Sequence, residues 1–262
     1  GEGFGFFGVS TTAGMAIGPL VGSFILHLGG FTAMFLGGCF ISLVSLAMAA
    51  SIRYNRLYVP RPDIGFKWGD LLELKTIVPS ANVLIIMLTY GGLISFIALY
   101  GHETGIKNPS GFFLIYALGI ISSRFTTGKQ LDRHGPGKIM VLCISMLVIG
   151  FPLLALWQSP AGYFLAAVIL GFGNGAVFPT FQAMTNNMVP AARRGAASST
   201  LFIAVDLGMG LGMILVGVIS QYFSIATAFL VCSATCLAGL VMFIFVTLGY
   251  YQSRKVGADR VV

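Results

Sequence analysis

Residues 207–253 read LGMGLGMILVGVISQYFSIATAFLVCSATCLAGLVMFIFVTLGYYQS and contain no Lys, Arg, Asp or Glu. A helix that crosses the hydrocarbon core of a membrane needs roughly 20 mostly apolar residues. This run is therefore long enough for two crossings, with a polar turn at Gln221-Tyr222. Three further stretches are free of charged residues: 3–52, 76–102 and 139–192. The sequence predicts an all-α membrane protein that crosses the bilayer several times.

Composition indicates the same class of protein. Charged residues make up 9% of the 262 residues and hydrophobic ones 56%, whereas a soluble domain carries about 25% charged residues. Polar, Gly-rich and Pro-containing breaks divide the apolar runs into eight predicted transmembrane helices. These helices run over residues 4–28, 31–52, 79–101, 110–127, 138–157, 161–183, 196–220 and 224–249.

Lys and Arg fix the predicted orientation, because cytoplasmic loops of membrane proteins hold an excess of these residues. Of the 15 Lys and Arg residues, all but Lys107 lie in or beside the segments that follow the second, fourth, sixth and eighth spans. We therefore expect both ends of the chain in the cytoplasm, and a plasma membrane location, which is the inner membrane in a bacterium. The net charge of +7 reflects this topology, and no nucleic acid partner is expected.

The seventh predicted span resembles the first. With residue 195 aligned to residue 1, Gly14 matches Gly208 and Gly18 matches Gly212. Parallel six-helix repeats are a known transporter architecture, and a period of six implies that four helices precede this chain. The predicted division is 1–52 for the last two helices of one bundle, 53–78 for a cytoplasmic loop, 79–249 for a six-helix bundle and 250–262 for a cytoplasmic tail. Within 53–78, a surface amphipathic helix and a solvated linker both fit the pattern.

Two motifs resemble those of a known family. The spacing of Gly5, Gly14, Gly18-Pro19 and Gly22 is similar to a motif on the fifth helix of drug:proton antiporters of the major facilitator superfamily. Residues 128–135, GKQLDRHG, resemble the cytoplasmic loop motif of that superfamily. The resemblance implies two six-helix bundles, of which this chain holds helices five to twelve, the C-terminal two-thirds. It also implies a transporter that is functional as a monomer when full length.

The loop motif supplies a group of predicted surface residues: Gly128, Asp132, Arg133 and Gly135, with Arg124 one helix turn earlier. A carboxylate is stabilised at a helix N-terminus, and the pseudo-symmetry of the family places this loop near the start of the first span. We expect Asp132 to hold the two bundles together there on the cytoplasmic side. An ordinary solvated loop is the alternative, and Arg124 fits a positional anchor better than a gating partner.

Asp206 is the one acidic residue inside a predicted span. A carboxylate in the middle of a bilayer costs about 3 kcal/mol or more, so it marks a functional site by default. Asp206 lies about 16 Å past Gly195 along a helix, near the centre of a core roughly 30 Å thick. We predict that it carries a coupling proton from within a cavity, while Gly208 and Gly212 pack against a neighbouring helix. A structural acid bonded to a neighbour is the alternative.

The sixth predicted span carries polar and aromatic side chains on one face, since Asn174, Phe178 and Gln182 recur every four residues. Amides in contact with lipid would lack partners, so this face is expected to point inward. Tyr90 precedes Gly91-Gly92, a predicted weak point of the third span. The residues predicted to line a substrate cavity are Tyr90, Asn174, Phe178, Gln182 and, on the first span, Thr12. Contacts between helices without any ligand are the alternative.

These features predict a secondary active transporter, namely a proton-coupled antiporter that exports small amphipathic organic compounds by alternating access. A symporter or uniporter for a sugar or an organic acid is the second transport hypothesis. An integral membrane enzyme or sensor is disfavoured, because His27, His102 and His134 are scattered without motif spacing. We expect no metal and no other cofactor, and the partners expected are a small-molecule substrate, protons and the lipid bilayer.

Overall fold

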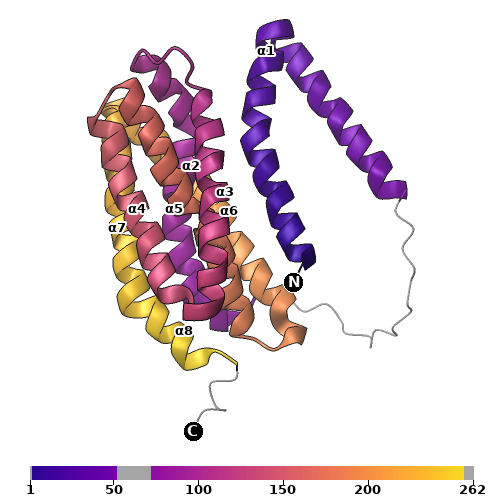
Figure 1. Ribbon diagram of the computed structural model, residues 1–262, viewed down its shortest axis with the longest axis vertical. Helices are drawn as coiled ribbons and strands as arrows, with labels where there is room; N and C mark the ends of the chain where they lie inside the picture. Colours follow the sequence, from indigo (N-terminus) through magenta and orange to yellow (C-terminus); the bar gives the residue numbers. More distant parts are fainter. Residues whose placement is uncertain (1, 52–71, 257–262) are drawn as a thin grey trace. The chain divides into compact units, whose positions relative to one another are not determined.

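The apolar runs form long helices in the computed structural model, which describes residues 2–51 and 72–256 (Figure 1). For some of these residues, chiefly 2–13 and 128–134, the backbone alone is described. The described residues contain helices and no strand, which confirms the predicted all-α class for this part of the chain. Residues 53–71 of the predicted cytoplasmic loop 53–78 lie outside the described residues, so the choice between a surface helix and a linker stays open there. Its last residues are helical, because a 3₁₀ turn (Leu74–Thr76) leads directly into the first helix of the second unit at Ile77.

The chain divides into two units, residues 1–67 and 68–262. In the first unit, α1 (Glu2–Ser51) consists of two helical arms that meet at Gly30, where φ is 69° and ψ is −170°. Glycine reaches this left-handed region at little cost because it has no Cβ atom. The predicted break at Gly29-Gly30 is therefore confirmed, and it turns two apolar runs into a hairpin.

The second unit is a helical bundle. It contains α2 (Ile77–Glu103), α3 (Gly111–His134), α4 (Pro136–Leu156), α5 (Pro160–Asn187), α6 (Arg194–Tyr222) and α7 (Ile225–Met242), and a π-helical turn (Phe243–Thr247) joins α7 to α8 (Leu248–Arg254). In this bundle α2 packs against α6 and α7, while α5 packs against α3 and α4. The six spans predicted between residues 79 and 249 all correspond to these helices.

Six helices among the described residues are long and apolar enough to cross a membrane. They are Leu28–Ser51, Leu74–Glu103, Pro136–Leu156, Pro160–Asn187, Ala191–Tyr222 and Ile225–Arg254. Gly111–Thr127 is a shorter apolar helix. The first arm of α1 is not among the six, so a total of eight crossings stays a prediction.

The predicted loop over residues 128–137 is wrong in its extent. Helix α3 continues to His134 and α4 begins at Pro136, which leaves Gly135 alone between them, with φ of 75° and ψ of 178°. Polar side chains such as Lys129 and Gln130 favour a helix as well as apolar ones do. The helix therefore ends at the glycine and not at the first charged residue, and the proline is pre-organised to start the next helix.

Glycines allow α2 and α6 of the second unit to approach closely. A Cβ atom on Gly91 would collide with the backbone of Met209, and one on Gly212 would collide with the backbone of Leu88. The predicted packing of the Gly208 and Gly212 face against a neighbouring helix is thus confirmed, and the neighbour is α2. Helix α2 runs unbroken through Gly91-Gly92, so these glycines allow close approach and do not form the weak point that we predicted.

A buried amide holds the π-helical turn between α7 and α8. The side-chain nitrogen of Asn82, on α2, donates hydrogen bonds to the carbonyl oxygen of Gly239 and to the hydroxyl oxygen of Thr247, both at 3.1 Å. Asn82 and Thr247 are fully buried. A side chain that satisfies backbone groups inside a helix is a common cause of such an irregular turn, and here it ties α2 to the last helix of the bundle.

Candidate functional site

The predicted cavity residues of the second unit lie on two of its helices. Tyr90 is on α2, and Asn174, Phe178 and Gln182 are on α5. Asn174 is buried, whereas the other three are half-buried. Residues spaced by four lie on one side of a helix, so the α5 set forms a strip whose buried end is Asn174.

Tyr116 of α3 connects this strip to α2, and the sequence analysis missed it. Its ring centroid lies 6.4 Å from that of Tyr90, and its hydroxyl group lies beside the Asn174 side chain. Phe112 stacks on the other side of Tyr116, with ring centroids 5.8 Å apart. In the sequence, Tyr116 is recognisable only as a hydroxyl-bearing side chain inside the apolar run 110–127. Its partners on other helices could be identified only from the fold.

Two oxygen atoms in this group lack hydrogen-bond partners among the described residues. They are the Tyr116 hydroxyl and the Asn174 Oδ1, both buried. The Asn174 nitrogen is bonded, since it donates to the carbonyl oxygen of Leu170 at 3.3 Å. An unsatisfied buried polar group costs about 1–3 kcal/mol, and such groups usually meet water or a ligand. The pair is thus suited to hydrogen-bond a polar group of a bound molecule.

An aromatic contact links α5 to α6 next to the acidic residue. The rings of Phe178 and Phe202 lie 5.4 Å apart between centroids, and Phe202 precedes Asp206 by one helix turn. Asp206 is exposed on the surface of the second unit, on a different side of α6 from Gly208 and Gly212, which are buried against α2. The structure therefore places Phe178, Phe202 and Asp206 along one border between α5 and α6.

The other predicted site residues are described only in part. The side chains of Thr12, Asp132 and Arg133 lie outside the description, as do details of Gly5, Pro19 and Gly128. Within the first unit, a Cβ atom added at Gly14, Gly18 or Gly22 would meet no described atom. The Arg124 Nε is buried and has no hydrogen-bond partner in the described part of the chain.

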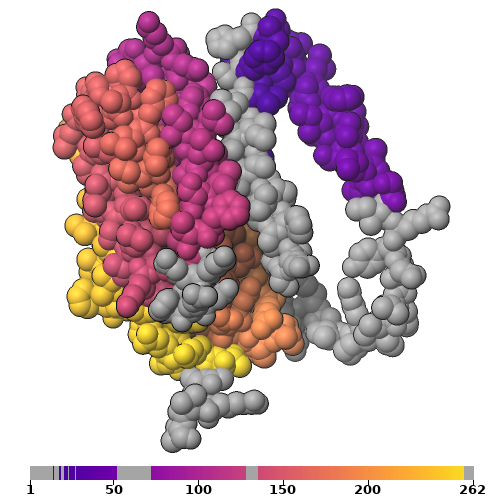
Figure 2. All heavy atoms as spheres, viewed as in Figure 1, coloured from indigo at the N-terminus to yellow at the C-terminus, as the bar shows by residue number. Residues whose placement is uncertain are grey.

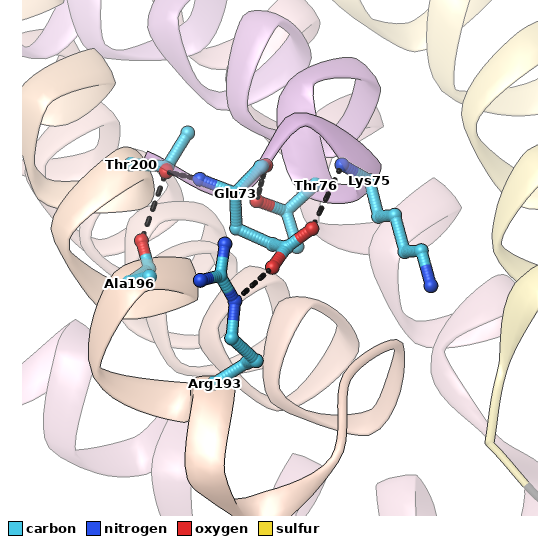
Figure 3. A network of polar contacts seen from close by, with 6 residues as sticks. All are labelled: Glu73, Lys75, Thr76, Arg193, Ala196 and Thr200. Carbon is cyan, nitrogen blue, oxygen red and sulfur yellow. Dashed lines mark hydrogen bonds and ion pairs between the residues drawn. The ribbon is translucent and has the colours of Figure 1, made fainter. Parts of the chain in front are cut away.

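A second polar group, also missed from sequence, joins the starts of α2 and α6 (Figure 3). Glu73 Oε2 accepts from Arg193 Nε at 2.9 Å, and the Glu73 N–H donates to the Thr200 hydroxyl oxygen at 2.8 Å. The Glu73 carbonyl oxygen also accepts from the Thr76 hydroxyl at 2.8 Å. Because Glu73 directly precedes the 3₁₀ turn Leu74–Thr76 that leads into α2, these bonds fix the end of the predicted cytoplasmic loop to the start of α6.

We expect Glu73→Ala to lower the free energy of unfolding by about 1–2 kcal/mol, since it removes a charge-assisted hydrogen bond from a largely buried carboxylate. Thermal unfolding of the purified protein in detergent measures the effect. Glu103→Ala is the matched control, because Glu103 is an exposed glutamate at the opposite end of α2, and it should change stability by less than about 0.5 kcal/mol. Equal melting temperatures for the two variants would argue against a structural role for the Glu73–Arg193 pair.

Metal-ligating residues are dispersed in this structure. The described residues include no group of three or more His, Cys, Asp or Glu that could hold a metal ion. Cys143, Cys232 and Cys236 are buried and free, as expected for small apolar side chains inside helices.

A bundle of apolar helices with an aromatic and amide strip, bordered by one carboxylate in mid-helix, is typical of an α-helical membrane transporter. A comparison with protein families identifies the class of transporter. The family model described as Major Facilitator Superfamily matches residues 80–260, and the chain belongs to this superfamily of transporters. The family assigned from the two sequence motifs is thus confirmed.

Curated relatives include other transporters of the superfamily. An MFS-type transporter of Pseudomonas aeruginosa is 30% identical over 170 residues, which cover 64% of this chain and 41% of the relative. The MFS-type transporter YhhS of Escherichia coli is 22% identical over 240 residues, 90% of this chain and 57% of the relative. The staphylopine export protein of Staphylococcus aureus is 23% identical over 257 residues, 92% of this chain and 64% of the relative. The chain thus spans 41% to 64% of the length of these relatives.

Proposed function

We propose that this chain is part of a proton-coupled antiporter that exports small amphipathic organic compounds. The observation that carries the proposal is the position of Asp206, exposed in the middle of α6 and next to the aromatic contact between Phe178 and Phe202. A carboxylate facing lipid at that depth would cost about 3 kcal/mol or more. The face that bears Asp206 is therefore better suited to a water-accessible cavity, where the carboxyl group can take up and release a proton.

The substrate class follows from the side chains beside this carboxylate. Aromatic rings offer an apolar surface, while the unpartnered oxygen atoms of Tyr116 and Asn174 offer a hydrogen-bonding pair. Ligand sites commonly combine a mostly apolar lining with a few fixed polar groups. The staphylopine export protein among the relatives supports the outward direction of transport.

The proposed cycle is alternating access, in which two bundles rock about the central site. In the full-length protein we propose that Thr12 contributes to the cavity and that the face of Gly5, Gly14, Gly18 and Gly22, together with Pro19, is the sliding surface between bundles. Asp132 and Arg133, with Gly128 and Gly135 around them, close the cytoplasmic side, and Arg124 anchors that helix end. The full-length transporter acts as a monomer in the plasma membrane, with both ends of this chain in the cytoplasm.

The direction of proton movement tests the coupling mechanism. The full-length protein is placed in sealed vesicles with a pH-sensitive dye inside, and a panel of amphipathic compounds is added without an imposed gradient. An antiporter moves protons opposite to the substrate, so entry of a substrate should make the vesicle interior more alkaline. Acidification on entry would indicate a symporter, and substrate uptake with no proton movement would indicate a uniporter.

We expect Asn174→Leu to raise the KM for transport about tenfold for compounds with hydrogen-bonding groups, because it removes one of two buried acceptors from the site. Leucine has a similar size, so the bundle should keep its fold. Transport assays in vesicles measure the KM, and Asn187→Leu, at the exposed end of the same helix, is the control that should leave it within about twofold. An unchanged KM in Asn174→Leu across the panel would remove this residue from the substrate site.

A further inference from the structure

The yellow helix α8 lies at the lower end of the second unit in Figures 1 and 2. A separate cavity is lined by residues from the start of α4 and from α8. Its volume is about 640 Å³, within the range of about 300–1,000 Å³ that is common for ligand sites. The residues that line it on α4 include Lys138 and Val141, and those from the last helix include Leu248, Tyr251 and Lys255. None of these residues belongs to the proposed transport site.

The charge of the cavity wall is positive. Lys138 lies in the first turn of α4 and Lys255 directly follows α8, and no acidic residue is among the described residues that line the cavity. A neighbouring cavity of about 400 Å³ shares Tyr251 and Lys255 and adds Arg194. The chain after α8 is held in place, because the N–H of Val256 donates to the carbonyl oxygen of Asn187 at 2.8 Å. The position of Lys255 beside Tyr251 is thus fixed by the fold.

The backbone at the start of α4 adds to this positive potential. The N-cap residue Gly135 has no side chain that could accept from the first turn, and Pro136 has no N–H, so the N–H groups that follow Pro136 are not capped by the N-cap residue. Helix N-termini carry a partial positive charge and bind phosphate groups. The cavity therefore combines two lysine ammonium groups with a helix N-terminus, a set of donors that suits a phosphate group.

The apolar part of the cavity indicates where that phosphate comes from. Val141 and Leu248 form part of the wall, and the same two elements, α4 and the π-helical turn before α8, carry exposed apolar side chains: Leu142, Ile149, Ile244 and Phe245. Such a surface in a membrane-spanning bundle contacts acyl chains. A molecule with a phosphate at the end of two hydrocarbon chains matches both parts, and basic pockets between helices at the cytoplasmic boundary bind anionic lipid headgroups.

We propose that the cavity between α4 and α8 binds the phosphate of an anionic phospholipid. Lys138 and Lys255 contact the phosphate, and Val141 and Leu248 pack against the first carbons of the acyl chains. The site lies on the side of the membrane that the Lys and Arg distribution predicts to be cytoplasmic. The site shares no residue with the Asp206 border, and of the residues proposed to close the cytoplasmic side only Gly135 is among the described residues that line the cavity.

Native mass spectrometry of the full-length protein in detergent tests this site. Phosphatidylglycerol and phosphatidylcholine with identical acyl chains are titrated separately, and the variants are Lys138→Gln with Lys255→Gln, and Lys138→Arg with Lys255→Arg. We expect wild type to prefer phosphatidylglycerol, the glutamine pair to lose at least about tenfold in affinity for it, and the arginine pair to retain it, since each cation near an anionic headgroup contributes substantially. Lys75→Gln, an exposed lysine at the start of α2, should change the affinity by less than about twofold.

Three results would overturn the proposal. One is equal binding of both lipids by wild type, and another is a loss in Lys75→Gln that equals the loss in the glutamine pair, which would indicate general surface charge. The third concerns a soluble ligand: inorganic phosphate or glycerol 3-phosphate that displaces phosphatidylglycerol at equal concentration would assign the site to a free phosphate compound. Thermal unfolding of the glutamine pair without added lipid should match wild type, so that reduced binding is not a folding defect.

Discussion

Asp206→Asn should reduce substrate export driven by a pH gradient by about two orders of magnitude, the low end of the cost of losing a proton-transferring side chain. Asparagine keeps the size and polarity of the side chain but cannot carry a proton. The exposed position of Asp206 on α6 also makes a packing defect unlikely to mimic this loss. Vesicles that contain the full-length protein, with an imposed pH gradient and a labelled substrate, provide the measurement.

Exchange of substrate across the same vesicles without a gradient should survive Asp206→Asn, because exchange does not require net proton movement. Asp206→Glu should keep gradient-driven transport, and Glu103→Gln, at the exposed end of α2, should behave as wild type. If Asp206→Asn retained full gradient-driven export, the coupling residue would have to lie elsewhere in the protein. If exchange were lost together with coupling, Asp206 would instead be a substrate ligand.

Gly212→Ala should destabilise the second unit by about 3 kcal/mol, the upper range for forcing extra atoms into a packed contact. The added Cβ atom would overlap the carbonyl oxygen and Cα atom of Leu88, which are backbone atoms that cannot rotate away. Helices α2 and α6 would have to separate, and Gly91 and Gly208 would lose their close contacts as well. Unfolding of the purified protein in a denaturing detergent series measures the change.

Gly210→Ala is the matched control on the same helix. A Cβ atom at Gly210 would meet no described atom, and alanine favours a helix over glycine by about 1 kcal/mol. The control should therefore be as stable as wild type or more stable. If Gly212→Ala and Gly210→Ala unfolded at the same detergent concentration, the α2–α6 crossing would not be the tight contact described above.

The sequence was sufficient to predict the helices and their order. Each charge-free run has the length of one or two membrane crossings, and the energetic cost of charge in lipid makes that pattern strong. The break at Gly30 and the six helices of the second unit followed from it. The end of α3 did not, because hydropathy reports where lipid ends and not where a helix ends, and residues 128–134 remain helical beyond the apolar run.

The candidate site was predictable only in part. Asp206 and the strip of Asn174, Phe178 and Gln182 were visible because their polarity conflicts with an apolar run. Tyr116 and Phe202 were not, since aromatic residues are ordinary within membrane helices and only the packing shows which ones meet. The Glu73–Arg193 ion pair could not be predicted from the sequence either. Charged residues near helix ends are common, and no sequence pattern indicates which of them meet across distant segments.

The π-helical turn at Phe243–Thr247 changes how the last helix must be compared with its relatives. An α-helix rotates by about 100° per residue, and a π-helical turn accommodates one residue more than a regular turn. The side chains of α8 are therefore out of phase with the pattern of α7, and Leu248 and Tyr251 are the α8 residues that line the cavity together with α4. A relative that lacks a single residue here would keep its span but present a different face of the helix to α4.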